Sequence, residues 1–233
     1  MITLVFLSGI IATYAQWGYT DDFARNKIFP LSAAAYSENP KDCVGKVASE
    51  ANTIRNVTVK CDDRNTCSGY TAVLPSQKAI VLSFRGTKTK LQLLEITRIT
   101  LGLKRWRWYV GNKYLGQVGK YFYDAFHAIW SHGMHEHLRE LLEKYPEYMI
   151  WITGHSLGGS LASLAASHIV ASELADGNRI KLVTFGQPRT GDETFVNYLS
   201  KQVYYRNGMG PSPQDFTVCD GGRNYSLQIC TPC

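Results

Sequence analysis

The stretch Tyr148–Ala175, YMIWITGHSLGGSLASLAASHIVASELA, decides the fold. Its first six residues form an apolar run that predicts a buried strand, and residues 156–175 carry apolar side chains at helical spacing. Between strand and helix lies Gly154-His155-Ser156-Leu157-Gly158, a G-x-S-x-G sequence whose glycines let neighbouring backbone pass close to the turn. We therefore predict that Ser156 adopts strained backbone angles and presents a nucleophilic hydroxyl; the alternative is a serine that merely caps the helix.

Strands and helices alternate on both sides of this stretch. Lys78–Phe84 (KAIVLSF) and Ile180–Phe185 (IKLVTF) are short apolar runs that predict two further buried strands, and Gln117–Lys144 predicts one long helix. This rhythm is typical of an α/β protein with a largely parallel sheet and helices on both faces. A length of 233 residues fits one domain.

An oxyanion formed at Ser156 needs backbone donors. The amide of Leu157 begins the new helix, where it has no intrahelical acceptor. A second donor is expected after an earlier strand, and the strand ending at Phe84 runs directly into Arg85-Gly86-Thr87. We predict the Thr87 amide as that donor, with an ordinary turn threonine as the alternative, and a structural role for Arg85.

The composition excludes disorder and favours export. Hydrophobic residues make up 45% and charged residues 19% of the chain, and the net charge of +6 is spread out, which does not indicate nucleic-acid binding. Met1–Tyr19 is uncharged, and its apolar run Ile2–Ile11 is too short to span a bilayer. We predict a secretory signal peptide over 1–16, a single domain over 17–233 and no transmembrane anchor; a buried first strand or helix is the alternative.

The cysteines also point to an extracellular protein. They are six in number, Cys43, Cys61, Cys67, Cys219, Cys230 and Cys233. Six thiols allow 15 pairings, and spacing alone chooses none of them. A local bridge between Cys61 and Cys67 suits the turn-forming residues between them, and Cys219 with Cys230 is a second candidate.

Asn56 and Asn224 begin N-x-S/T triplets, which are glycosylation acceptors in exported eukaryotic proteins. No metal site is predicted. His132, His135 and His137 lack the H-E-x-x-H spacing of a zinc site, and we expect a solvated helix face there.

Several blocks together resemble a known family. They are FARNKIFPLSAAAYS (23–37), VLSFRGT (81–87), YFYDAF (121–126), ITGHSLGGSLASLAAS (152–167) and TFGQPRTGDETF (184–195). These blocks are similar to those of the class 3 (fungal-type) lipases, in particular their secreted nematode-like members. The resemblance implies an α/β-hydrolase fold and hydrolysis of acylglycerol esters without a cofactor. It implies Ser156 as the nucleophile and an oxyanion hole formed by Thr87 and Leu157.

In that family a lid follows the residue corresponding to Thr87, which here places it at Lys88–Trp108. This segment mixes leucine and isoleucine with basic residues and contains Trp106 and Trp108. We predict a helix that lies on a lipid–water interface, with a buried core helix as the alternative. The apolar character favours a lipid ester over a feruloyl-type ester.

The remaining catalytic residues are not identifiable. In this fold the order along the chain is serine, acid, histidine, yet only His168 follows Ser156, at about three helical turns and about 18 Å. Asp192 matches no catalytic acid of the family, and Asp215 and Asp220 lie in a turn-rich tail where we expect solvated or capping roles, so acid and base stay unassigned. We expect a fold truncated on its C-terminal side.

Three explanations are open: an incomplete or alternatively spliced gene model of an active lipase, which we favour; an inactive lipid-binding relative; or a histidine from 117–144 brought in by an unusual fold.

Overall fold

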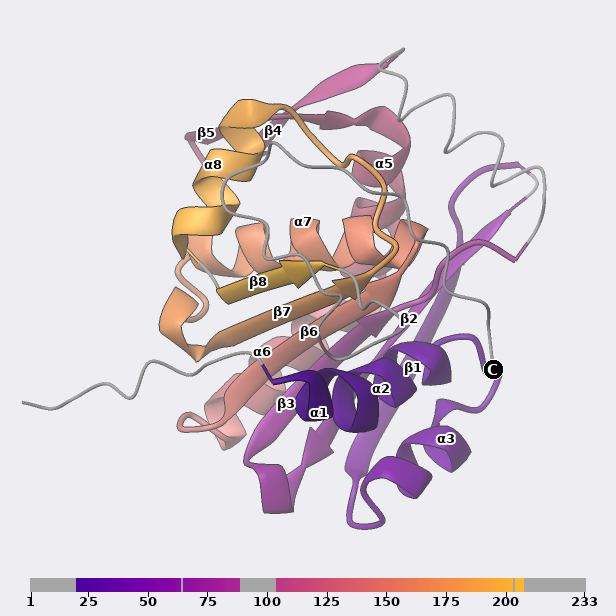
Figure 1. Ribbon diagram of the computed structural model, residues 1–233. Coiled ribbons are helices and arrows are strands. Elements are labelled where there is room, and N and C mark those ends of the chain that lie inside the picture. Colours follow the sequence, from indigo (N-terminus) through magenta and orange to yellow (C-terminus); the bar gives the residue numbers. More distant parts are fainter. Residues whose placement is uncertain (1–19, 64, 89–103, 203, 208–233) are drawn as a thin grey trace, which may run out of the picture.

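The computed structural model describes residues 20–63, 65–88, 104–202 and 204–207 (Figure 1). The predicted signal peptide at 1–16, and the candidates Cys219, Cys230 and Asn224, lie outside these ranges. No helix in the part described is long and apolar enough to cross a bilayer.

A six-stranded sheet with the order β1-β2-β3-β6-β7-β8 forms the centre of the molecule. The strands are β1 (Asn52–Lys60), β2 (Thr66–Leu74), β3 (Ala79–Phe84), β6 (Met149–His155), β7 (Ile180–Phe185) and β8 (Tyr204–Asn207). The pairs from β3 to β8 are parallel, whereas β1 and β2 join antiparallel at one edge. Every residue of β3 and β7 is buried, as expected for strands covered on both faces. The predicted mostly parallel α/β sheet is confirmed.

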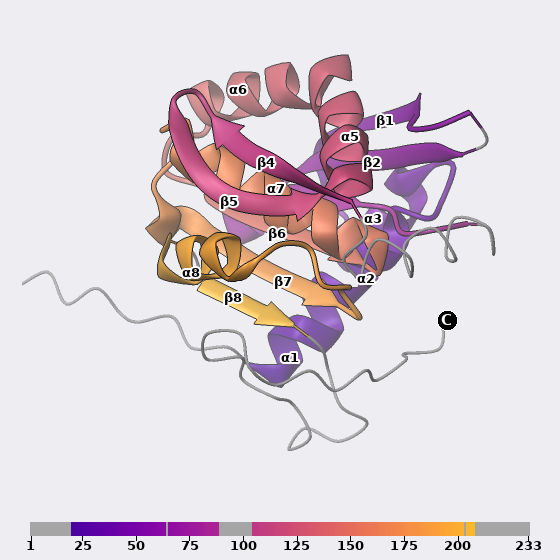
Figure 2. The same ribbon diagram turned by 90° about the horizontal axis from the view of Figure 1, so that it is seen from above.

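Helices cover both faces of the sheet (Figures 1 and 2). One core lies under α5 (Lys120–Ile129), α6 (His135–Lys144), α7 (Leu157–Ala171) and α8 (Glu193–Gln202). The other lies under α1 (Asp21–Phe23), α2 (Phe29–Ala34) and α3 (Pro40–Val47). Short π-helical turns occupy Ala24–Ile28 and Trp130–Met134, and 3₁₀ turns occupy Pro75–Gln77 and Gly177–Arg179.

The predicted long helix Gln117–Lys144 is wrong in two places. Residues 117–119 belong to β5 (Lys113–Gly119), because Gln117 pairs with Arg107 across a hairpin. The remainder is divided into α5 and α6 by a kink at which Gly133 takes φ +106°, a left-handed conformation that glycine adopts without strain.

The predicted lid is also wrong at its end. Residues 105–108 form part of β4 (Arg105–Val110), the partner strand of β5. Trp108 is fully buried and its indole N–H donates to Ser167 Oγ at 3.0 Å, so it belongs to the core rather than to a lipid-facing helix. Residues 89–103 lie outside the described ranges.

The Cys61–Cys67 bridge is present, with the two Cα atoms 5.5 Å apart, which confirms that prediction. Cys43 is a free thiol. The solvated helix face predicted for the three histidines is wrong for His137, which is buried with its Nδ1 hydrogen-bonded to Thr71 Oγ1. In the described ranges, no group of three or more acidic, histidine or cysteine side chains is placed to hold a metal ion.

Candidate active site

Ser156 occupies the turn between β6 and α7. Its backbone has φ 55° and ψ −125°, a conformation that L-residues rarely adopt. Hydrogen bonds on both sides hold it there, since its N–H donates to the Phe185 carbonyl and its own carbonyl accepts from the Gly159 N–H, each at 2.9 Å. The side chain makes no capping hydrogen bond and is partly exposed. The predicted strained turn is therefore confirmed, and the serine side chain does not cap the helix, although the residue stands at its N-cap position.

The two glycines of the motif are needed because backbone lies directly against them. A Cβ added to Gly154 would overlap the carbonyl oxygen of Gly158, and a Cβ on Gly158 would overlap the carbonyl oxygen of Phe84. Neither neighbour is a flexible side chain that could move aside. The sequence folds into this tight turn because only glycine leaves room for the start of α7 beside the sheet.

The same contact brings the end of β3 to the start of α7. Phe84 pairs with Gly154 in the parallel sheet, so the segment after Phe84 leaves the sheet beside the turn. Leu157 is the first residue of α7, and its N–H has no acceptor within that helix. Thr87 lies three residues beyond the end of β3 and is partly exposed. The structure thus places both predicted oxyanion donors on segments that meet at Ser156.

Tyr36, which the sequence analysis did not select, links these segments. Its hydroxyl is 2.8 Å from His155 Nδ1 and accepts a hydrogen bond from the Gly86 N–H. A Cβ on Gly86 would overlap this hydroxyl and the His155 carbonyl oxygen. Burial raises the pKa of Tyr36 to about 12, so the hydroxyl stays protonated, and burial lowers the pKa of His155.

Arg85 has the structural role that the sequence predicts. It is 5% exposed, and its guanidinium donates to the carbonyl oxygen of Thr66 and, at 3.0 Å, to Thr66 Oγ1. Burial lowers the pKa of this guanidinium, but an arginine remains protonated at neutral pH. Arg85 therefore fastens the segment that leads to Thr87 onto β2.

A series of side-chain hydrogen bonds also connects the first turns of α7 to the segment that follows β7. Ser163 Oγ donates to Gln187 Oε1 at 3.1 Å, and Gln187 Nε2 donates to Thr190 Oγ1 at 2.7 Å. Thr190 Oγ1 donates in turn to Ser160 Oγ at 2.9 Å. Asp192 then accepts from the N–H of Phe195 at 2.9 Å and so caps α8, a structural role rather than a catalytic one.

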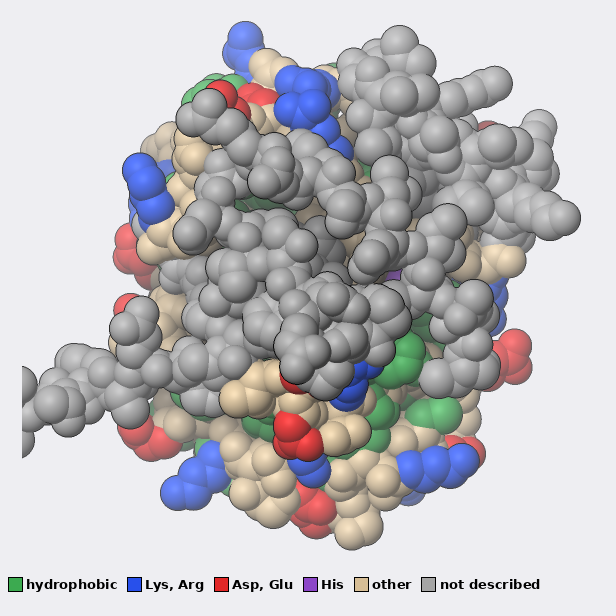
Figure 3. All heavy atoms as spheres, in the orientation of Figure 1, with side chains coloured by type: hydrophobic (Ala, Val, Ile, Leu, Met, Phe, Trp, Pro, Cys, Tyr) green, Lys and Arg blue, Asp and Glu red, His purple; other side chains and the backbone are tan. Residues whose placement is uncertain are grey.

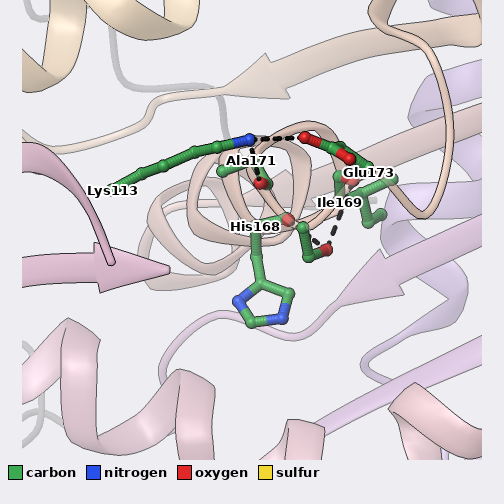
Figure 4. A network of polar contacts seen from close by, with 6 residues as sticks. Lys113, His168, Ile169, Ala171 and Glu173 are labelled. Carbon is green, nitrogen blue, oxygen red and sulfur yellow. Dashed lines mark hydrogen bonds and ion pairs between the residues drawn. The ribbon is translucent and has the colours of Figure 1, made fainter. Parts of the chain in front are cut away.

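All six histidines lie in the described residues, and none is hydrogen-bonded to the Ser156 hydroxyl. His155 is held by Tyr36, and His137 by Thr71. His168 packs among aromatic rings, 5.1 Å from the ring of Trp130 between centroids, and burial lowers its pKa to about 4. Figure 4 shows its ring pointing away from Lys113 and Glu173 at the far end of α7. The structure therefore brings Ser156 together with the segments that carry Leu157 and Thr87, and among the described residues it assigns no base.

Comparison with known families is consistent with this geometry. The model of the family described as Lipase (class 3) matches residues 81–209. Lipase ZK262.3 of Caenorhabditis elegans is 35% identical over 215 residues, which cover 88% of this chain and 58% of that protein. The secreted mono- and diacylglycerol lipase 2 of Gibberella zeae is 37% identical over 79 residues, 34% of this chain and 19% of that protein.

Solved lipases share the fold. Lipase II from Rhizopus niveus superposes with a TM-score of 0.65 at 24% identity, covering 77% of this chain and 68% of that chain. The triacylglyceride lipase of Rhizomucor miehei gives a TM-score of 0.64 at 24% identity, covering 82% and 71%. These neighbours support the α/β-hydrolase fold. The chain spans little more than half the length of the nematode relative.

Proposed function

Because the chain belongs to the class 3 lipase family, we propose that it hydrolyses acylglycerol esters with Ser156 as its nucleophile. The observation that carries this proposal is the backbone of Ser156, at φ 55° between β6 and α7 with its hydroxyl free of any capping bond. Strain of this kind persists where the surrounding structure fixes it, and it is typical of a nucleophile turn.

The proposed reaction begins when Ser156 Oγ attacks the ester carbonyl carbon and its proton leaves to a base. The carbonyl oxygen becomes an oxyanion that accepts hydrogen bonds from the amides of Leu157 and Thr87, each worth about 3 kcal/mol in a dry site. As the tetrahedral intermediate collapses, the base returns that proton to the leaving oxygen, so the glycerol-side alcohol departs and an acyl-serine remains. Water then releases the fatty acid and restores the hydroxyl.

The identity of the base decides how fast this proceeds. With the oxyanion donors and substrate binding alone, a serine hydrolase keeps an acceleration of about a thousandfold to ten-thousandfold over water. A second candidate function, lipid binding without turnover, is favoured by one observation on the described residues: none of their six histidines hydrogen-bonds the Ser156 hydroxyl.

Hydrolysis of p-nitrophenyl butyrate and p-nitrophenyl palmitate by the full chain and by Ser156→Ala tests the proposal. We expect p-nitrophenol release that falls to background in Ser156→Ala, and labelling of Ser156 by a fluorophosphonate. Equal rates in the two proteins would leave only lipid binding. Faster turnover of methyl ferulate than of either fatty ester would instead assign a feruloyl-type esterase.

Export to the extracellular space is part of the proposal. It is supported by the Cys61–Cys67 bridge, because disulfides persist in oxidising compartments, and by the predicted signal peptide. Asn56 is exposed on the edge strand β1, where a glycan would meet solvent. Expression in a secretory eukaryotic host should place the protein in the medium, with a glycosidase-sensitive mass that falls in Asn56→Gln. Retention of the protein in the cell would contradict export.

A further inference from the structure

The hairpin of β4 and β5 presents an exposed surface that is both aromatic and basic. Trp106, Tyr109 and Tyr114 are the large hydrophobic side chains exposed in the described part of the chain, at 50%, 47% and 46%. Tyr109 and Tyr114 face each other across the strands with ring centroids 5.2 Å apart. Large apolar side chains gathered in one exposed element are typical of a binding surface.

The charge of this hairpin has one sign. Residues 104–120 contain five basic and no acidic side chains. Lys113 pairs with Glu173, and Lys120 pairs with Asp124. Lys104, Arg105 and Arg107 are exposed and have no ion-pair partner among the described residues. We call Lys104, Arg105, Trp106, Arg107, Tyr109 and Tyr114 the hairpin surface.

The inner face of the hairpin explains why its outer face is rigid. Trp108, Val110, Leu115 and Val118 are buried in the core beneath it. Trp106 pairs with the buried Val118 and so leaves the hairpin on this inner side, beside the ring of Tyr123 at 6.2 Å and with the Lys120 ammonium 5.3 Å from its centroid, yet half of it remains exposed. The exposed rings are therefore presented by a strand pair that is fastened to the core.

The hairpin runs along α7, and its basic end lies at the Ser156 end of that helix. Near the tip, Lys113 Nζ donates to the Ala171 carbonyl at 3.0 Å, at the last residue of α7 (Figure 4). At the base, the Gly119 N–H donates to the Thr190 carbonyl, and Thr190 Oγ1 bonds Ser160 in the first turn of α7. Arg105 pairs with Gly119 and thus lies at that same end. Basic side chains appear at the top of the space-filling view, where Figure 1 places β4 and β5 (Figure 3).

We propose that the hairpin surface binds an anionic lipid surface and holds the Ser156 end of α7 beside it. Three unpaired cations complement acidic headgroups, and amphipathic tryptophan and tyrosine rings suit the boundary between headgroups and acyl chains. The direction of the hairpin along α7 then presents the ester-cleaving end of the fold to the membrane. The proposed ester hydrolysis is needed only to explain why the Ser156 end of α7 should face the membrane. Binding of the hairpin surface to anionic lipid does not depend on it.

Sedimentation with vesicles tests the proposal, using the full chain with Ser156→Ala so that no lipid is cleaved. We expect partition onto phosphatidylcholine–phosphatidylserine vesicles, weakened by salt, and little onto phosphatidylcholine alone. Each cation beside an anionic leaflet strengthens binding about fivefold, so Arg105→Gln with Arg107→Gln should weaken it about 25-fold. The matched pair Lys41→Gln and Lys46→Gln, exposed on α3, removes the same charge and should leave partition unchanged.

Tryptophan emission gives a second measurement. The chain has five tryptophans. Trp108, Trp130 and Trp151 are buried, and Trp17 lies outside the described residues, so the experiment uses a Trp17→Phe background. A blue shift on vesicle binding that disappears when Trp106→Phe is added places the hairpin at the membrane. Equal partition onto both vesicle types, equal losses in the two double variants, or binding to heparin with none to vesicles would each overturn the proposal. Vesicle binding with no ester cleavage would instead refute the proposed function and leave the surface intact.

Discussion

Replacing Tyr36 with phenylalanine removes one oxygen from the point where the segment Arg85–Thr87 meets the turn at Ser156. Two partners lose their bond, His155 Nδ1 at 2.8 Å and the Gly86 N–H. A buried polar group left unpaired costs about 1–3 kcal/mol. Because the Tyr36–His155 pair is only partly buried, we take the lower part of that range, about 2 kcal/mol for the two together. For a chain of this size that free energy lowers Tm by about 4–8 °C.

The same substitution should slow the chemistry, because the Gly86 amide immediately precedes Thr87. If misplacement of the Thr87 amide costs about 1.4 kcal/mol of its interaction with the oxyanion, the rate falls about tenfold. The assay is the second-order rate of fluorophosphonate labelling of Ser156, measured below the melting transition of both proteins. Neither a nucleophilic buffer nor added salt should restore the labelling rate of Tyr36→Phe, because the substitution changes the geometry of the site.

Tyr109→Phe is the matched control, because it removes a hydroxyl from a ring that is 47% exposed. It should change neither Tm nor labelling. If Tyr36→Phe also melted and labelled like the parent, the hydroxyl would not position the oxyanion segment. A coupling near zero between Tyr36→Phe and His155→Gln in a double-mutant cycle would refute the Tyr36–His155 link itself.

Three further predictions concern stability. His168 has a folded pKa of about 4 against an ordinary 6.5, so its neutral form contributes stability that is complete above pH 6.5 and lost as pH falls toward 4. The shift corresponds to about 3 kcal/mol, which solvent screening of this partly exposed ring reduces to about 2 kcal/mol. His168→Leu should remove that part of the fall in unfolding free energy and so flatten the Tm–pH curve; an unchanged curve would contradict it. Gly158→Ala should destabilise by about 3 kcal/mol through overlap with the last carbonyl of β3, whereas Gly45→Ala, with open space around it, should be neutral or stabilising. Reduction of the Cys61–Cys67 bridge should lower the free energy of unfolding by about 2 kcal/mol in denaturant titration, and no shift in midpoint would count against it.

The sequence predicts the centre of the fold well because the signals there are local. The strand, turn and helix of residues 148–171 follow from an apolar run, a glycine-flanked serine and an alanine-rich repeat in one continuous stretch. The predicted strand Ile180–Phe185 begins and ends where β7 does, because all six of its side chains are buried and the apolar run has clear limits. Ser156 at φ 55° is the local consequence of that sequence.

Non-local contacts account for what was missed. Gln117 reads as helix by periodicity, but its pairing with Arg107 makes it a strand residue. Trp108 in an apolar segment fits a lipid-facing helix equally well, until packing against Phe126 at 5.5 Å places it in the core. Tyr36 and His155 are 119 residues apart, so no spacing in the sequence relates them. Strand β1 carries few buried side chains and so lacks an apolar signal.

The parts that hold Ser156 in place do not include a base. Its backbone is fixed by the Phe185 carbonyl and by the glycines that leave room for α7 beside β3. The segment leading to Thr87 is fastened by Tyr36 and by the Arg85 guanidinium. None of these contacts depends on a proton acceptor at the hydroxyl. Positioning of the nucleophile and its activation are therefore separable in this fold, and fluorophosphonate labelling together with ester turnover measures the two independently. Labelling without turnover would mean that the described residues supply the geometry of a lipase and that only the proton transfer is missing.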